Sequence, residues 1–435
     1  MTLREKIVNE IRQRGPIPFS RYMELCLYDP ELGYYSKNAE QFGKAGDFYT
    51  SSDVHAVFGR LLARQFEEMW GILGRPGQLE ILELGPGRGL FAQDVLDWSE
   101  KKFPQFFAAL HYSLVERSPA LRERLKLTLG RHFNLGKASL PQRLKPPFSN
   151  MPNGTAEAVP FHGGTDSLSS NKTGKGTTAV PFDDSFDSLT SIGTGTASAV
   201  SSWLGFERAL ASEVPLIIFA NEFFDALPVE VLSPEGELRV SEKDGRFVET
   251  WAPASAEELE LLDHHGVNPA AGERIEILLF AQRYMSQIAA MVTRGFLVVI
   301  DYGYTRQEQL AGRHRGTLTA YRQHSVSANL YEAPGEQDIT AHVNFTALTA
   351  AAEQNGMLAQ PLVTQSQFLM GIGENNQFAD AFEDCRLPQE HAKVALQLKH
   401  LVTPAGVGES FQVLVCSRGV EAARLSGLSF GKSRG

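Results

Sequence analysis

Three glycines at alternate positions form the segment with the clearest chemical meaning. An apolar strand ends in Glu83, and Gly85, Gly87 and Gly89 follow it. Glycine permits a tight turn and lets a ligand approach the backbone closely. A helix that begins near Leu90 would direct its free amide groups at the same ligand. The pattern therefore predicts a strand, a ligand-binding loop and a helix.

The order of these glycines separates two kinds of ligand. A dinucleotide-binding loop, G-x-G-x-x-G, needs glycine at position 90, where this chain has leucine. The form E-x-G-x-G-x-G instead resembles the first motif of Rossmann-like methyltransferases, whose loop holds the amino-acid end of S-adenosylmethionine. For the glycines alone, a structural turn without a ligand stays an alternative.

Glu116 ends the next apolar run, Y-S-L-V-E at 112–116. An acidic residue at the tip of a neighbouring strand can accept hydrogen bonds from both hydroxyls of a ribose. A solvated strand end is the alternative for a glutamate considered alone. Together with the glycine loop, Glu116 is predicted to bind ribose.

A polar and aromatic turn follows the apolar run 216–220. Ligands bind at the carboxyl edge of open α/β sheets, so Asn221 is predicted to contact the cofactor. Glu222 and Asp225 stand three positions apart, so in a helical turn they would share a face and could clamp a cation. The alternative is a helix N-terminus whose acids favour the helix dipole.

Three more residues are candidates for the same site. His342 could accept a released proton, or it could be a loop histidine with satisfied hydrogen bonds. Asp47 and Thr50 could contact the methionine portion of the cofactor, or they could cap the helix that follows them.

The elements that must position these residues follow an α/β pattern. Short apolar runs flanked by helix-like segments are typical of strands buried in a mostly parallel sheet. Alternation around Asp244-Gly245 predicts a hairpin that decorates this sheet. Between Tyr302 and Val343 we expect a long polar and aromatic loop. The runs predicted as strands cover 79–84, 111–115, 216–220, 296–300, a segment near 363 and 411–416, and helices are predicted over 55–70 and 345–354.

These patterns divide the chain into regions. Residues 134–202 are rich in Gly, Ser, Thr and Asn and contain an imperfect repeat, G-T-A-E-A-V-P-F at 154–161 and G-T-T-A-V-P-F at 176–182. Too few of them are apolar to offset the ordering entropy, which predicts a flexible insertion. The expected regions are a helical N-terminal cap over 1–75, a Rossmann-like core over 76–133 and 203–303, the insertion over 134–202, a substrate-side lid over 304–344, the C-terminal part of the core over 345–420 and a loose tail over 421–435.

Composition excludes several classes of protein. The 435 residues carry a formal net charge of -10, which argues against a nucleic-acid platform. Cys26, Cys385 and Cys416 stand far apart without metal-ligand spacing, which predicts a reducing compartment and no metal site. Every apolar run is far shorter than the ~20 residues that cross a bilayer. We expect a cytoplasmic protein without a membrane span.

Six separated motifs resemble the MidA family of methyltransferases, and the resemblance covers nearly the whole chain except 134–202. The chain departs from the family pattern at Ser52, Asp53 and Asn344, which weakens what the resemblance says about the lid. The motifs are G-D-F-Y-T-S at 46–51, E-L-G-P-G-R-G at 83–89, N-E-F-F-D-A-L-P at 221–228, D-Y-G-Y at 301–304, G-T-L-T-A-Y-R at 316–322 and D-I-T-A-H-V at 338–343.

The resemblance implies a class I methyltransferase fold with a helical N-terminal extension, inserted substrate-side elements and S-adenosylmethionine as cofactor. The family includes a mitochondrial enzyme that methylates an arginine of a respiratory complex I subunit. It therefore implies a protein arginine as acceptor, with a complex I subunit as candidate partner; a homodimer stays open. The alternatives are an assembly factor that binds the cofactor structurally, a small-molecule methyltransferase and, disfavoured by Leu90, a nicotinamide oxidoreductase.

Overall fold

A computed structural model describes residues 1–36, 56–140, 214–322, 325–327, 329–420 and 424–430. The predictions for Asp47 and Thr50, and those for most of the insertion, lie outside these residues. No helix in the described ranges is long and apolar enough to cross a membrane.

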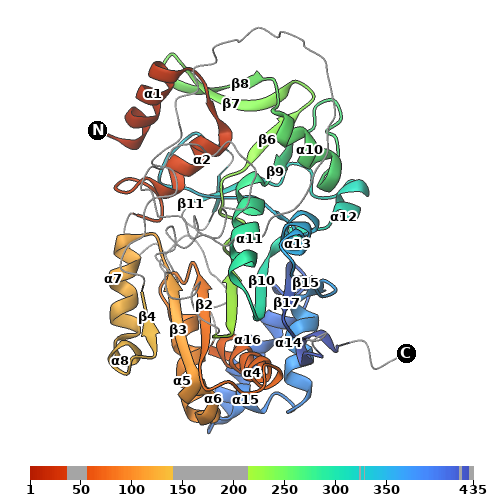
Figure 1. Ribbon diagram of the computed structural model, residues 1–435. Coiled ribbons are helices and arrows are strands. Elements are labelled where there is room, and N and C mark those ends of the chain that lie inside the picture. The colour runs from red at the N-terminus through yellow and green to blue at the C-terminus, as the bar shows by residue number, and fades with distance from the viewer. Residues whose placement is uncertain (37–55, 141–213, 323–324, 328, 421–423, 431–435) are drawn as a thin grey trace, which may run out of the picture.

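The largest sheet has nine strands in the order β15-β17-β10-β5-β2-β3-β4, with β14 paired to β10 and β16 to β17 (Figure 1). From β4 to β10 neighbouring strands are parallel, and β17 runs antiparallel to β10. The mostly parallel sheet predicted from the apolar runs is confirmed. Its strands are β2 (Leu79–Leu84), β3 (Leu110–Val115), β4 (Ala138–Ser139), β5 (Leu216–Asn221), β10 (Gly295–Tyr304), β14 (Val343–Asn344), β15 (Leu358–Ala359), β16 (Val363–Thr364) and β17 (Phe411–Arg418).

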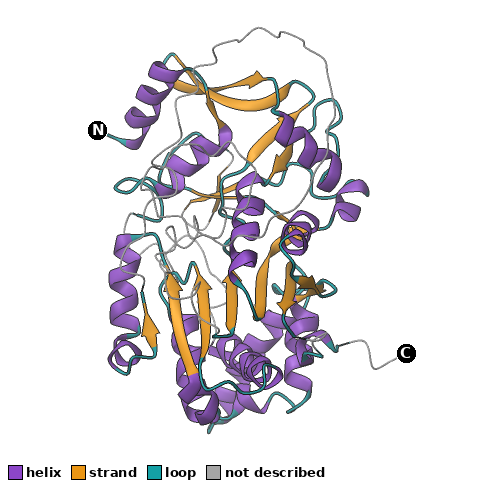
Figure 2. Ribbon diagram, viewed as in Figure 1, coloured by secondary structure: helices purple, strands orange, loops and turns teal. Residues whose placement is uncertain are grey.

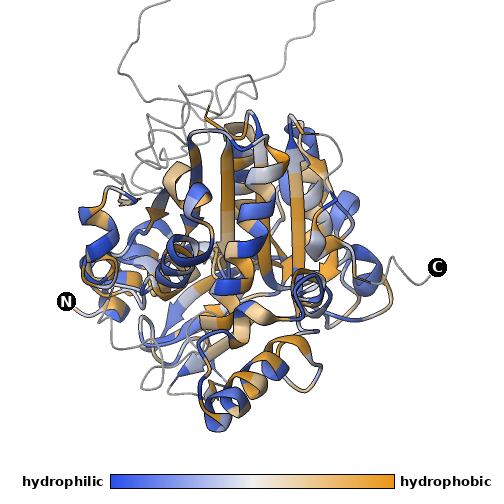
Figure 3. Cartoon of the chain, turned by 90° about the horizontal axis from the view of Figure 1, so that it is seen from below, coloured by the Kyte–Doolittle hydropathy of each residue, from blue (hydrophilic) through white to orange (hydrophobic). Residues whose placement is uncertain are grey.

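Helices cover both faces of this sheet, which is why its strands are apolar at nearly every position (Figures 2 and 3). In β5, Ile217 and Phe219 belong to one buried cluster while Ile218 and Ala220 belong to another. Each fully buried aliphatic or aromatic side chain stabilises the fold by about 1.5–3 kcal/mol. The first cluster includes α4 (Ala56–Ile72), α5 (Leu90–Lys102) and α14 (Gln365–Glu374), and the second includes α11 (Leu279–Met291) and α13 (Phe345–Gln354).

A second sheet lies beside the N-terminal helices and is antiparallel. Its order is β1-β7-β6-β9, with β8 paired to β7. The predicted hairpin around Asp244-Gly245 is confirmed, and both turn residues have positive φ. The expectation that it decorates the main sheet is wrong, because β7 pairs with β1 and β6 instead. The elements here are α1 (Leu3–Arg14), β1 (Ile17–Pro18), α2 (Phe19–Tyr28), β6 (Glu230–Ser233), β7 (Gly236–Lys243), β8 (Arg246–Ala252), α10 (Ala256–His265) and β9 (Ile275–Ile277).

A third, three-stranded sheet occupies the segment expected to be a long loop. Its order is β12-β11-β13. Ala320 and Ile339 face each other in the ladder and are both buried, so this pair anchors the sheet in the core. The segment contains α12 (Arg306–Leu310), β11 (Thr319–Arg322), β12 (Ser325–Ser327) and β13 (Asp338–Thr340).

The remaining elements are short or peripheral. They are α6 (Pro104–Ala109), α7 (Pro119–Thr128), α8 (Gly130–Asn134), α15 (Ala379–Phe382), α16 (Pro388–Val402) and the 3-10 helix η2 (Ser426–Leu428).

Candidate active site

The carboxyl ends of β3, β2 and β5 lie level at one edge of the main sheet, and the neighbouring β10 continues past them. The register pairs Leu84 with Val115 and with Ala220, and it pairs Asn221 with Ile300. The residues that follow these strand ends are therefore brought together. They are the glycine loop, Glu116 and the turn after β5, and Asp301 of β10 lies against that turn.

The glycine loop needs glycine for two different reasons. Gly85, Gly87 and Gly89 all have positive φ, which strains any residue with a Cβ. A Cβ on Gly85 or Gly89 would also collide with Phe223 or with Leu125. A Cβ on Gly87 would meet no described atom within 4 Å. Gly87 is thus the position at which the loop is open to a ligand.

Alanine substitutions should separate these two roles. Gly87→Ala is expected to cost about 1–2 kcal/mol of unfolding free energy from its left-handed backbone. Its methyl group would occupy the space that the ligand needs, so affinity for S-adenosylhomocysteine should fall at least about tenfold. Gly89→Ala is expected to be less stable than Gly87→Ala, because its Cβ would lie 2.5 Å from Leu125 Cδ2. Urea unfolding and calorimetry measure the two effects, and normal affinity in Gly87→Ala would contradict this role.

Glu116 lies against the glycine loop and is 7% exposed. Its Oε1 accepts a hydrogen bond from the amide of Ser118 at 2.7 Å, and the amide of Gly87 also donates to its carboxylate. Burial raises the pKa of Glu116 to about 7, although the amides of Ser118, Arg117 and Gly87 oppose the shift. A ribose diol would donate to the ionised form, as predicted from the sequence.

Because the pKa of Glu116 is about 7, the affinity for the cofactor is expected to rise with pH. Hydroxyl donors favour the ionised carboxylate, so binding should be strongest above the pKa of about 7 in the free protein. Below it, affinity for S-adenosylhomocysteine should fall by up to about tenfold per pH unit. Calorimetry between pH 5.5 and 8.5 measures this dependence. Asp301 titrates in the same range, so Glu116→Gln must flatten the profile if Glu116 is its source.

Glu83 is buried beneath the loop and bonded to the adjacent strand. The hydroxyl of Tyr112 donates to its Oε2 at 2.9 Å. Burial raises the pKa of Glu83 to about 8. This bond ties the ends of β2 and β3 together, and a direct contact between Glu83 and the cofactor stays a prediction.

The turn after β5 carries Asn221, Glu222 and Asp225. The side chain of Asn221 donates to Glu222 Oε1 at 3.1 Å, and Glu222 has a left-handed φ of 50°. Asp225 is 4% exposed, and its Oδ1 has no hydrogen-bond partner among the described residues. Burial and the charges of Asp301 and Asp338 hold the pKa of Asp225 well above its usual range. The ionised form of Asp225 is therefore costly by itself, and a cationic ligand beside it would compensate that charge.

Asp301 organises this turn and was not assigned a role from the sequence. Its Oδ2 accepts from the successive amides of Phe223, Phe224 and Asp225 at 3.2, 2.9 and 3.3 Å. Asp301 follows the apolar run 296–300, so the rule that selected Glu116 would also have selected Asp301.

His342 is paired with a second histidine. Its Nδ1 lies 3.0 Å from Nδ1 of His314, whose ring stacks on Tyr304. Burial, with a further contribution from His314, lowers the pKa of His342. The lowered pKa favours the neutral form of His342, which is the form that can accept a proton. Its catalytic role stays a prediction.

The N-terminal segment also reaches this edge, which the sequence did not indicate. The hydroxyl of Tyr28 donates to the carbonyl oxygen of Ala226 at 2.9 Å. The guanidinium of Arg117 lies over the Tyr28 ring, 4.9 Å from its centroid. The end of α2 thus packs against both the turn after β5 and the residue that follows Glu116.

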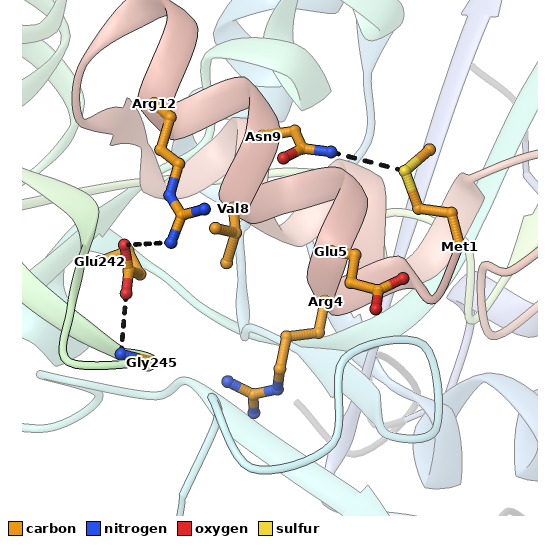
Figure 4. Close-up of a pocket in the computed structure, with 8 residues that line it drawn as sticks. All are labelled: Met1, Arg4, Glu5, Val8, Asn9, Arg12, Glu242 and Gly245. Atoms are coloured by element: carbon orange, nitrogen blue, oxygen red, sulfur yellow. Dashed lines mark hydrogen bonds and ion pairs between the residues drawn. The ribbon is translucent and has the colours of Figure 1, made fainter.

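A groove of about 470 Å³ lies elsewhere, between α1 and the turn from β7 to β8 (Figure 4). Arg12 and Glu242 form an ion pair of 3.3 Å on its wall. None of the residues predicted to carry chemistry lines it, so we do not assign the active site there. Its lining residues are Met1, Arg4, Glu5, Val8, Asn9, Arg12, Glu242 and Gly245.

The residues at the sheet edge fit S-adenosylmethionine. Gly87 offers open space, Glu116 offers a carboxylate, and Asn221 Oδ1 is a buried acceptor without a hydrogen-bond partner among the described residues. The strand order places an antiparallel strand, β17, between β10 and the edge strand β15. This topology and site define a class I S-adenosylmethionine-dependent methyltransferase.

Comparison with known proteins gives the family. A model of S-adenosyl-L-methionine-dependent methyltransferases, Methyltransf_28, matches residues 61–363, and the chain belongs to this family. The chain is 27% identical to the Drosophila melanogaster protein arginine methyltransferase NDUFAF7 homolog, mitochondrial, over 98% of this chain and 86% of that protein. It is 29% identical to human protein arginine methyltransferase NDUFAF7, mitochondrial, over 93% of this chain and 81% of that protein.

The chain is also similar to a solved structure that contains S-adenosyl-homocysteine, the product that S-adenosylmethionine leaves after methyl transfer. A methyltransferase-like protein from Burkholderia thailandensis, crystallised with S-adenosyl-homocysteine, matches with a TM-score of 0.71 and 26% identity. The match covers 98% of this chain and 94% of that one. The resemblance to the MidA family, the fold class and S-adenosylmethionine as cofactor are thereby confirmed.

Proposed function

We propose that this methyltransferase transfers its methyl group to an arginine side chain of a protein. The observation that carries the proposal is the environment of Asp225. This acid is buried, its Oδ1 has no hydrogen-bond partner among the described residues, and the acids Asp301 and Asp338 lie near it. Such a site suits a cationic acceptor. The arginine methyltransferase names of the similar fly and human proteins support the same acceptor.

The residues of the site have separate tasks in this mechanism. Gly87, Glu116 and Asn221 would hold the cofactor, which supplies a methyl group on a sulfonium. An arginine side chain stays protonated because its pKa exceeds ~12. Glu222 and Asp225 would bind the guanidinium in a fork and favour electron density on the attacking nitrogen. His342 would accept the released proton.

The turn after β5 would shield the transferred methyl group from water through its aromatic side chains, and Asp301 would keep the turn aligned. The Phe223 ring packs against Phe224 and Tyr284, with centroid distances of 5.3 and 5.2 Å. Asp301 holds the backbone of the same turn through three amides. An aligned, water-poor site is what methyl transfer mainly requires, because the reaction needs little acid-base chemistry.

The acceptor protein that we propose is a subunit of respiratory complex I. The resemblance to the MidA family supports this partner. We also propose the cytoplasm as the location, on the basis of the cysteine pattern, whereas the similar animal proteins are named mitochondrial.

Deletion of the gene tests the proposed function. A proteome-wide search should find a protein methylarginine that disappears on deletion and returns with the wild-type gene but not with Glu222→Ala. If no methylarginine changes, arginine is not the acceptor. If Glu222→Ala binds the cofactor and restores full biological activity, a structural assembly factor explains the protein better.

A further inference from the structure

We propose that Asp338 is a further acidic residue of the acceptor site, which binds the guanidinium together with Glu222 and Asp225, and that Tyr35 positions Asp338. The inference rests on the proposed function, because it assigns residues to the recognition of the same acceptor. Asp338 belongs to β13, in the third sheet, and Asp225 belongs to the turn after β5.

Asp338 is held in one orientation by a residue more than 300 positions away. The hydroxyl of Tyr35 donates to Asp338 Oδ1 at 2.8 Å, and Asp338 is 4% exposed. The Tyr35 ring packs against Tyr28 and Tyr34, with centroid distances of 5.5 and 5.3 Å. A tyrosine fixed in this way orients one oxygen of the carboxylate and leaves its charge in place.

Asp338 and Asp225 are joined through short backbone connections. The amide of Ala341, three residues after Asp338, donates to the carbonyl oxygen of Asp225 at 2.9 Å. On the other side, Tyr28 donates to the carbonyl oxygen of Ala226. The two acids therefore lie on segments that are bonded to each other, and each segment is bonded to one of two tyrosines, Tyr28 and Tyr35, that pack together.

The acids Asp225, Asp301 and Asp338 are buried close to one another, and a bound cation would compensate their charges. After burial, the strongest influences that raise the pKa of Asp225 are Asp301 and Asp338, both of which are acidic. Burying carboxylates together is costly unless a cation or hydrogen-bond donors compensate them. Asp301 is already bonded to three amides, whereas Asp225 Oδ1 has no partner among the described residues. A guanidinium has five N–H donors in one plane and can bridge two carboxylates.

In this arrangement the N-terminal segment and the third sheet both contribute residues to the acceptor site. Tyr28 and Tyr35 come from the N-terminal segment, Asp338 comes from the third sheet, and Asp225 comes from the core. The acceptor site is thus assembled from three parts of the chain. A change in Tyr35 should weaken acceptor recognition without touching the cofactor residues.

Binding of a small cation tests this inference directly. The probe is N-butylguanidinium, titrated by calorimetry into the full chain saturated with S-adenosylhomocysteine, with n-butylurea as a neutral control of similar shape. We expect the wild type to bind the cation and not the urea. Asp338→Asn should weaken cation binding at least tenfold, and Tyr35→Phe should weaken it about threefold. Both variants should keep wild-type affinity for S-adenosylhomocysteine.

A matched control replaces a buried acid outside the site. Glu230 on β6 is 7% exposed and lies in the second sheet, so Glu230→Gln should bind the cation as the wild type does. Unchanged cation binding in Asp338→Asn, while Asp225→Asn loses it, would overturn the inference and leave the proposed function standing. A wild type that does not prefer the cation to the urea would overturn the proposed function itself. If Asp338→Asn fails to fold, unchanged binding in Tyr35→Phe overturns the positioning role.

Discussion

Replacing Asp225 by asparagine, or Glu222 by glutamine, is expected to lower methyl transfer to protein by about 100- to 1000-fold. Both changes keep the shape of the side chain and remove its negative charge. Removing one partner of a buried charge pair costs about 2–5 kcal/mol, which corresponds to about 30- to 5000-fold and includes the expected range. The effect should appear in kcat/KM for the acceptor, because we propose that both acids bind its guanidinium.

The measurement is transfer of a labelled methyl group from S-adenosylmethionine into an extract of cells that lack the gene. Affinity for S-adenosylhomocysteine, measured on the same preparations, should change less than about threefold. Glu230→Gln again serves as the control for loss of a buried acid. Wild-type transfer in both Asp225→Asn and Glu222→Gln would show that neither acid takes part in acceptor recognition.

Replacing Glu116 by alanine is expected to weaken the binding of S-adenosylhomocysteine by about 100-fold or more. Hydrogen bonds to a charged group contribute about 1.5–3 kcal/mol each, and the carboxylate is predicted to accept from two ribose hydroxyls. Removing it also releases the amides of Ser118 and Gly87, which loosens the loop.

Calorimetry measures this loss, and urea unfolding shows whether the variant is still folded. Glu123→Gln, an exposed acid on the helix that follows β3, should keep wild-type affinity. If Glu116→Ala binds S-adenosylhomocysteine with unchanged affinity, the ribose contact lies elsewhere.

The parts of the fold that sequence predicted are those that depend on local patterns. The strand over 79–84 has the bounds expected from its apolar run, because both of its faces are covered by helices. The hairpin at Asp244-Gly245 was visible because the turn itself requires positive φ. The glycine loop, Glu116 and Asn221 came together because each follows a strand of one parallel sheet.

The parts that sequence did not predict depend on distant contacts. The bond from Tyr35 to Asp338 joins residues 303 positions apart, and no local pattern marks it. The third sheet was read as a loop because β13 has only three residues and pairs with a strand of four. Asp301 could have been predicted from sequence, since it directly follows the apolar run 296–300.

Titration of the purified protein with S-adenosylmethionine, and separately with S-adenosylhomocysteine, tests the central claim most directly. We predict that the glycine loop, Glu116 and Asn221 form one cofactor site, so each compound should bind saturably in a one-to-one ratio. Binding of both should weaken together in Gly87→Ala and in Glu116→Ala. Absence of saturable binding for either compound would contradict the assignment of this sheet edge as a methyltransferase site.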